Sequence, residues 1–122
     1  MPVRGLTIVL ASPDQDRLRS ALGMAATQAA LGGPARLFLD GASVGLLVQP
    51  IAAPRDADHR TAGLPTLAEL VETALTLGVS ITLCQTGLAL AGLAADRIDP
   101  RFAIGGMTMM LASLADDRLI AL

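Results

Sequence analysis

Cys84 is the only cysteine in the sequence, and its thiol is the side chain best suited to nucleophilic chemistry. It follows an apolar run at 79–83 and precedes Gln85 and Thr86, where Thr86 is expected to cap a short helix. If the run is a parallel strand, its carboxyl end is where α/β proteins place ligands, and a helix N-terminus there stabilises a thiolate. A free cysteine is also among the most buried residue types, so a structural role stays open.

Gly105 and Gly106 stand at a second strand end, before a helix expected to run from Met107 to Ala115. Their backbone N–H groups could receive an anion, and in a parallel sheet they would lie on the same edge as Cys84. A tight turn with close packing explains the two glycines equally well.

His59 is the only histidine, and it lies among charged residues in the stretch 55–60. Such a histidine is usually solvated, although it could act on Cys84 as a base or a gate. One cysteine and one histidine do not make a metal-ligand cluster, and Asp56 with Asp58 is too few carboxylates for calcium. We therefore expect no metal.

The first expected strand-to-helix turn, at 12–16, has no glycine and carries the carboxylates of Asp14 and Asp16, which would repel a phosphate. Flavin and dinucleotide binding are thus disfavoured, and we expect no cofactor. The sequence has no lysine, which excludes Schiff-base chemistry and a phosphate-loop lysine.

A length of 122 residues fits one domain spanning 1–122, and 52% of the residues are hydrophobic. The net charge of −2 and the lack of Trp and Tyr argue against nucleic acid as a partner. The stretch 73–95 has no charge, but its Thr, Ser and Gln residues and Gly78 favour a helix, a buried strand and a helix over a membrane span.

The single cysteine excludes an internal disulfide, and no secretory signal is visible at 1–11, so we expect a cytoplasmic protein. The apolar content exceeds what a small domain hides, which favours a homo-oligomer. Met107, Met109 and Met110 are expected to fill the core. A solvated face that keeps the protein soluble is expected for Arg4, Arg17, Arg19 and Arg36.

Strand patterns at 6–11, 36–39, 79–83, 102–104 and 118–121 alternate with helical ones. Ser12 is expected to cap the first helix with Pro13 at its first position, and Thr66 with Glu69 forms a second capping box. A short helix is expected at 44–48, and 51–65 reads as a mobile loop. The order predicts a three-layer α/β/α domain with a five-stranded parallel flavodoxin-like sheet.

Several positions form one ordered pattern along nearly the whole chain. They are Gly78-Val79, the strand, Cys84, Gly92 eight residues later, Phe102, Gly105, Ser113-Leu114 and Asp117-Arg118. In this pattern the chain resembles the DsrE/DsrF-like family of sulfur-relay proteins, which includes TusD-like subunits. The resemblance implies a persulfide on Cys84, protein donors and acceptors of sulfur, and a homotrimer or hexamer.

Proteins of this type tend to carry two arginines just before the glycine that matches Gly92, whereas this chain has Leu90 and Ala91. Two hypotheses follow. The first is a sulfur carrier or sulfurtransferase that accepts sulfane sulfur on Cys84. The second is a non-catalytic binding or regulatory module of the same fold that docks a small anion or a protein partner, with Cys84 in a structural role.

Overall fold

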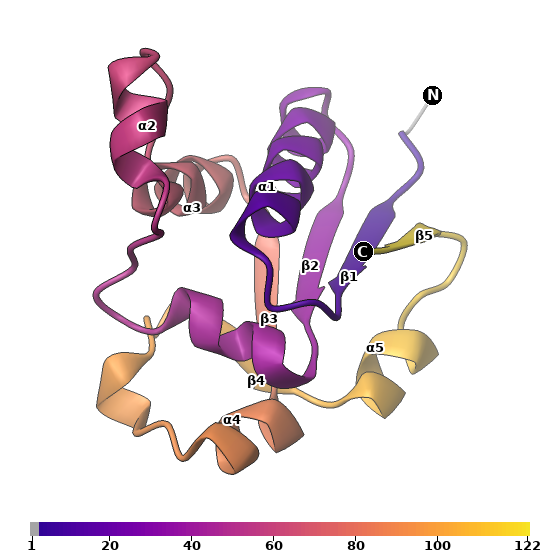
Figure 1. The fold of residues 1–122 in the computed structure, drawn as a ribbon. Coiled ribbons are helices and arrows are strands. Elements are labelled where there is room, and N and C mark those ends of the chain that lie inside the picture. The colour runs from indigo at the N-terminus through magenta and orange to yellow at the C-terminus, as the bar shows by residue number, and fades with distance from the viewer. Residues whose placement is uncertain (1–2) are drawn as a thin grey trace.

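Five short strands form one parallel sheet in the order β4-β3-β2-β1-β5 (Figure 1). They are β1 (Leu6–Leu10), β2 (Ala35–Leu39), β3 (Ser80–Cys84), β4 (Ala103–Gly105) and β5 (Arg118–Ala121). This computed structural model describes residues 3–122. The predicted three-layer α/β/α fold with a parallel flavodoxin-like sheet is confirmed.

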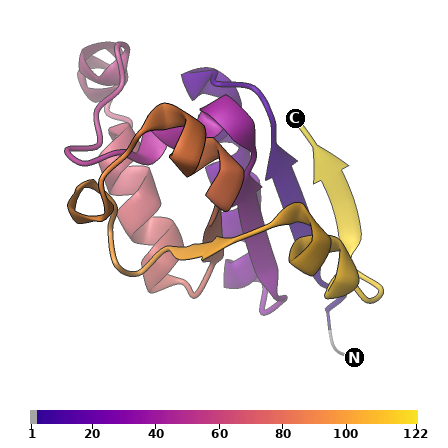
Figure 2. The same cartoon turned by 90° about the horizontal axis from the view of Figure 1, so that it is seen from below.

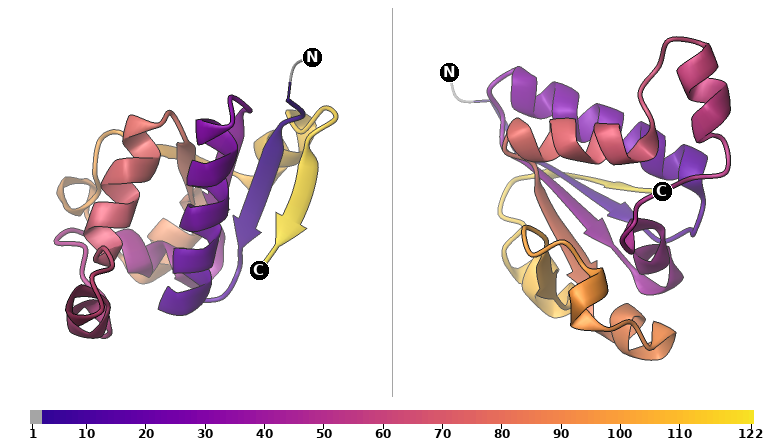
Figure 3. Two further views of the ribbon diagram at one scale, coloured as in Figure 1. Left: turned by 90° about the horizontal axis from the view of Figure 1, so that it is seen from above. Right: turned by 90° about the vertical axis from the view of Figure 1, so that its left-hand side faces the viewer.

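The handedness of the connections explains which helix covers which face. From β1 to β4 each strand is added on the same side of its predecessor, so right-handed crossovers place α1 (Gln15–Ala30) and α3 (Leu67–Thr76) on one face. The chain then returns across the sheet to β5, and this reversal puts α5 (Met107–Ala112) on the other face (Figure 3). The second face is consequently covered by one short helix.

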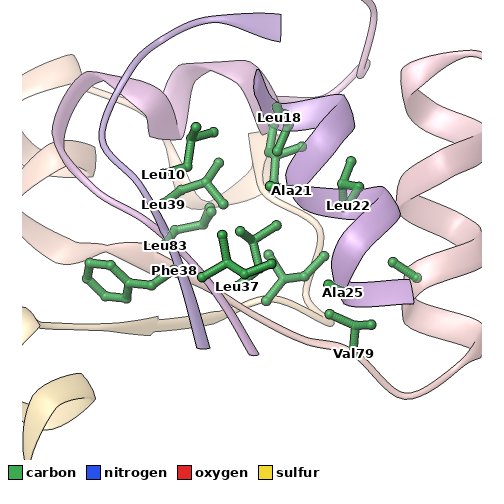
Figure 4. Close-up of a cluster of buried hydrophobic side chains, with 14 of the residues drawn as sticks. Leu10, Leu18, Ala21, Leu22, Ala25, Leu37, Phe38, Leu39, Val79 and Leu83 are labelled. Atoms are coloured by element: carbon green, nitrogen blue, oxygen red, sulfur yellow. The ribbon is translucent and has the colours of Figure 1, made fainter. Parts of the chain in front are cut away.

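The main core lies between the sheet and the α1–α3 layer. Leu37 and Leu83 point from the sheet toward α1, whose side chains Leu18 and Leu22 face them. All four side chains are almost fully buried (Figure 4). Phe38 points to the opposite face and is still only 2% exposed. Strand residues on both faces are therefore buried, as the nearly continuous apolar runs predict.

Two helix starts test the expected caps. Thr66 and Glu69 form the predicted capping box at the start of α3, and that prediction is confirmed. The predicted cap at Ser12 is wrong, because Asp14 caps α1 by accepting from the backbone N–H groups of Asp16 and Arg17. A carboxylate cap also complements the helix dipole, which a hydroxyl does less strongly.

The remaining elements differ from the predictions mainly at their ends. A 3₁₀ helix, η1 (Gly41–Leu47), replaces the short helix expected at 44–48, and α5 ends at Ala112 instead of Ala115. The chain also forms α4 (Gln85–Ala91) and the 3₁₀ turn η2 (Ala95–Arg97). Between residues 3 and 122, no helix combines the length and apolar character needed to cross a membrane.

The stretch predicted as a mobile loop contains a helix, α2 (Asp56–Thr61), and is tied to α1. Asp56 forms an ion pair of 2.6 Å with Arg19 and accepts from the backbone N–H groups of Ala53 and Leu67. Burial raises the pKa of Asp56, but the two backbone hydrogen bonds and the Arg19 charge outweigh it, so the pKa lies below its usual value. Arg19 is only 9% exposed, so its place on a solvated face was wrongly predicted.

Candidate functional site

Cys84 is the last residue of β3 and also the N-cap residue of α4, so strand and helix meet at this one position. Its backbone is extended, with φ −64° and ψ 122°, as N-cap residues usually are. The predicted position at the carboxyl end of a parallel strand is therefore present. The neighbouring strand places Gly105 directly opposite Cys84.

The alternation of strand side chains determines which face Cys84 serves. Leu83 points toward α1, so Cys84 and Thr82 start out on the opposite face, which is the face that carries Phe38 and α5. Alternation thus places Cys84 on the face opposite α1, and its side chain is still part of the buried hydrophobic cluster. The residue lies at the carboxyl edge of the sheet, at the start of α4 and opposite the end of β4.

The predicted cap at Thr86 is wrong. Helix α4 begins at Gln85, so Thr86 is already its second residue, and no side chain caps the helix. The N-cap side chain thus accepts no hydrogen bond from the first N–H groups of α4, and the residue next to these donors is Cys84 itself. This arrangement moves the thiol one step closer to the helix end than a Thr86 cap would have done.

Helix α4 is held at the carboxyl edge by η1, which lies beside it (Figure 2). The contact is made by two glycines: a Cβ on Gly87 would stand 3.0 Å from the carbonyl carbon of Gly41. Only a glycine at position 87 permits this approach. Cys84 itself is only 7% exposed and belongs to the cluster of buried hydrophobic side chains.

Gly105 and Gly106 lie on the same edge as Cys84, as expected. Gly106 is the N-cap residue of α5, and it has no side chain to cap that helix. Two short helices therefore start at this edge without side-chain caps, one after Cys84 and one after Gly106. Gly105 also packs against the neighbouring strand, because a Cβ at this position would stand 3.4 Å from the Thr82 methyl group.

The structure does not bring His59 to Cys84. His59 lies on α2, outside the α1–α3 layer, whereas Cys84 precedes α4 at the opposite side of the sheet (Figures 1 and 3). The His59 ring bonds the backbone carbonyl of Arg55 through Nδ1 at 2.8 Å. A base or gate at Cys84 must come from elsewhere.

The residues 3–122 contain no group of three or more His, Cys, Asp or Glu side chains that could hold a metal ion. The amino end of α1, which in many α/β proteins receives a phosphate, is already occupied by the Asp14 carboxylate. A bound phosphate would have to displace this cap and its negative charge.

A polar cluster around Arg36, on the sheet face that α5 covers, was not predicted from the sequence. Arg36 was expected on a solvated face, but it contacts Thr7 on the neighbouring strand and Ser113 just after α5. A signal was available, because Arg36 and Phe38 stand two apart in one strand and must share a face. A charged residue on the same strand face as a buried aromatic residue indicates that the charge is at least partly buried.

No model of a known protein family matches the chain, and no curated protein is similar to it in sequence. Similar solved structures exist, however. A conserved protein of unknown function from Bacteroides thetaiotaomicron, BT1422, is 19% identical with a TM-score of 0.68, over 97% of this chain and 94% of that one. The chain shares its fold.

Two further structures show the same similarity. The ychN protein from E. coli is 16% identical with a TM-score of 0.70, over 97% of this chain and 99% of that one. The protein of unknown function MTH1491 from Methanobacterium thermoautotrophicum is 14% identical with a TM-score of 0.64, over 98% and 100%. At these identities the similarity concerns the fold, over essentially the whole chain.

Proposed function

We propose that the protein is a sulfur carrier that holds sulfane sulfur as a persulfide on Cys84. In the loading step the Cys84 thiolate attacks the terminal sulfur of a donor persulfide. A new S–S bond forms at Cys84, the S–S bond of the donor breaks, and the donor leaves as a thiolate. The step needs no cofactor and no outside oxidant, because the sulfane sulfur moves without net oxidation.

The observation that carries this proposal is the position of Cys84. It is the one cysteine of the chain, and it sits at the carboxyl end of a parallel strand as the N-cap residue of a helix without a side-chain cap. Backbone N–H groups and the helix dipole favour a negative charge at this point, which suits both a thiolate and a persulfide anion. The sequence resemblance to sulfur-relay proteins points to the same residue.

The 7% exposure of Cys84 sets a condition on the proposal. A donor has to reach the sulfur either with a slender group or after α4 has moved away from η1. Helix α4 packs against η1 at the Gly87–Gly41 contact, so weakening this contact should speed the loading of Cys84.

Mass spectrometry tests the proposal after incubation with polysulfide or with a sulfur-loaded cysteine desulfurase. The wild-type chain should gain the mass of one sulfur atom, reductant should remove it, and Cys84→Ser should gain nothing. His59→Ala is the matched surface variant, and it should load at the wild-type rate because His59 lies far from Cys84 in the fold. A folded wild-type chain that stays unmodified would refute the carrier function.

The burial of Cys84 favours one alternative, a non-catalytic binding or regulatory module in which Cys84 fills space at the sheet edge. The two functions differ in what Cys84→Ala and Cys84→Ser should do to stability. A carrier thiol is replaceable with little loss, whereas a packed one leaves a small cavity or a buried hydroxyl. Clear destabilisation of both variants, together with absent loading, would support the binding module.

We also propose that the chain works as a homo-oligomer. Apolar side chains are exposed on the α5 side of the sheet: Met109 is 71% exposed, Leu111 49% and Leu119 46%. The prediction that the α5 methionines fill the core is correct only for Met110, which is 7% exposed. Light scattering at micromolar concentration should give a multiple of 12.5 kDa, and Met109→Glu should lower it. A wild-type mass of 12.5 kDa would contradict this proposal.

A further inference from the structure

A cavity of about 280 Å³ lies between α5 and the sheet face that carries Phe38. Its floor includes Phe38 and Thr82, its outer wall includes Met109 and Met110, and residues 103–106 close one side. Arg36, Thr7 and Ser113 also line it. This volume is close to the lower end of small-molecule sites, which are mostly apolar with a few polar groups, so it suits a small ligand.

The guanidinium of Arg36 is held on two of its three nitrogens. Nε donates to the Thr7 hydroxyl at 3.0 Å, and Nη1 donates to the Ser113 hydroxyl at 2.7 Å. The Thr7 hydroxyl in turn donates to the Asp117 carboxylate at 2.8 Å, and that carboxylate stands 3.5 Å from Nε. Arg36 is thus fixed in place, with its anionic neighbour on the Nε side.

The third nitrogen, Nη2, is buried and has no hydrogen-bond partner within the described residues 3–122. A buried donor on a charged group is costly when it is left unpaired, and most such groups have an acceptor. The side chains that fix Nε and Nη1 leave Nη2 as the free arm of a cation that lines a cavity. The missing acceptor is therefore an oxygen, and the positive charge of the arm favours an anionic one.

Apart from Thr82 and the two glycines at 105 and 106, the other residues that line the cavity are apolar. The ring of Phe38 and the thioethers of Met109 and Met110 provide a surface for a short hydrocarbon chain or a small ring. Met109 is 71% exposed and unbranched, so it can rearrange to admit a ligand to Nη2. A single charged donor, Nη2 of Arg36, beside an apolar surface suits a ligand that has an anionic head group and an apolar chain.

We propose that the cavity under α5 binds a small carboxylate with a short apolar chain, whose head group accepts from Nη2 of Arg36 and whose chain packs on Phe38 and Met110. The ligand is a free small molecule. This site is separate from the thiol of Cys84, which does not line the cavity, and the inference does not depend on sulfur transfer.

The test is a titration of the full-length chain with hexanoate, followed by amide chemical shifts in NMR spectra. Acetate provides the head group alone, and 1-hexanol and hexylammonium provide the chain with a neutral or a cationic head. Hexanoate should bind about tenfold or more tightly than 1-hexanol, because it adds a hydrogen bond between charged groups. The shifts should concentrate at 36–38 and 105–113.

Two variants locate the head group. Arg36→Gln removes both the positive charge and Nη2, so it should lose the preference for hexanoate over 1-hexanol. Arg97→Gln removes a guanidinium outside this cavity, and it should bind hexanoate like the wild type. Cys84→Ser should also bind normally, which separates this inference from the carrier function.

Several results would overturn the inference. Equal binding of hexanoate and 1-hexanol would mean that Arg36 does not select the head group. Unchanged hexanoate binding in Arg36→Gln would mean that the guanidinium of Arg36 does not hold the head group. Absence of any shift at 36–38 and 105–113 would mean that no free carboxylate enters, as when a second copy of the chain covers the cavity.

Discussion

The contact between α4 and η1 provides the sharpest test of how Cys84 is buried. In Gly87→Ala the added Cβ would stand 3.0 Å from the carbonyl carbon of Gly41 and 3.2 Å from its Cα. Carbon atoms prefer to stand about 3.5–4.0 Å apart, and the carbonyl oxygen of Gly41 would lie even closer to the added Cβ than these two carbons, so α4 and η1 must separate by about an ångström. The position of the added Cβ is set by the α4 backbone, and the Gly41 atoms that it meets are backbone atoms, so neither side can yield by a rotamer change.

We expect Gly87→Ala to lower the free energy of unfolding by about 1–3 kcal/mol, the usual cost of overpacking. Urea unfolding measures this loss. In parallel, the rate at which iodoacetamide alkylates Cys84 in the native protein should rise, because α4, which begins at the residue after Cys84, has moved.

Two control variants separate local from global effects. Gly23→Ala in α1 places its Cβ in open space, so it should stabilise the protein by about 0.4–1 kcal/mol. Asp56→Asn destabilises the chain away from α4, and its alkylation rate reports global unfolding alone. The reasoning fails if Gly87→Ala unfolds at the wild-type urea concentration, or if its alkylation rate matches that of an equally destabilised Asp56→Asn.

Two further predictions concern the α1–α3 layer. Thr66→Ala removes the capping box of α3 and should cost about 0.5–2 kcal/mol in urea unfolding, whereas Thr76→Ala at the helix end should cost little. Asp56→Asn weakens the bond to the buried Arg19 and should cost about 1.5–3 kcal/mol near pH 7. Because the pKa of Asp56 is lowered on folding, its contribution is present above about pH 4 and is lost as the pH falls further. The difference in melting temperature between wild type and Asp56→Asn should therefore shrink below that pH, and a difference constant down to pH 2 would contradict the assignment.

Local signals in the sequence predicted most of the elements. The capping box at Thr66 and the glycine at 78, which has a φ of +90°, mark the ends of α3 as expected. The caps of α1 and α4 were misplaced, because Ser12 and Thr86 are good caps but other residues occupied those positions. Ser12 and Asp14 differ little in intrinsic preference for the cap position, so local sequence does not decide between them, whereas Cys84 occupies the cap position of α4 without making a cap hydrogen bond.

The position of Cys84 at a strand end followed from the apolar run and the helix signal behind it. Its burial did not, because Cys84 belongs to a cluster of buried side chains drawn from distant parts of the chain, and no local pattern specifies such a cluster. The isolation of His59 has the same origin. Its separation from Cys84 depends on the side of the α1–α3 layer on which α2 packs, and the Arg19–Asp56 ion pair fixes that side.

Residue patterns were enough to predict the parallel sheet, the order of its elements and a single cysteine at a strand end, because periodicity, turn residues and residue identity are local properties. They did not predict that α5 alone covers the second face, or that Arg36 lines the cavity beneath it. Strand order and crossover handedness bring Thr7, Arg36 and Ser113 together from distant parts of the chain. No local pattern specifies these long-range contacts, because they result from the direction in which the chain crosses the sheet.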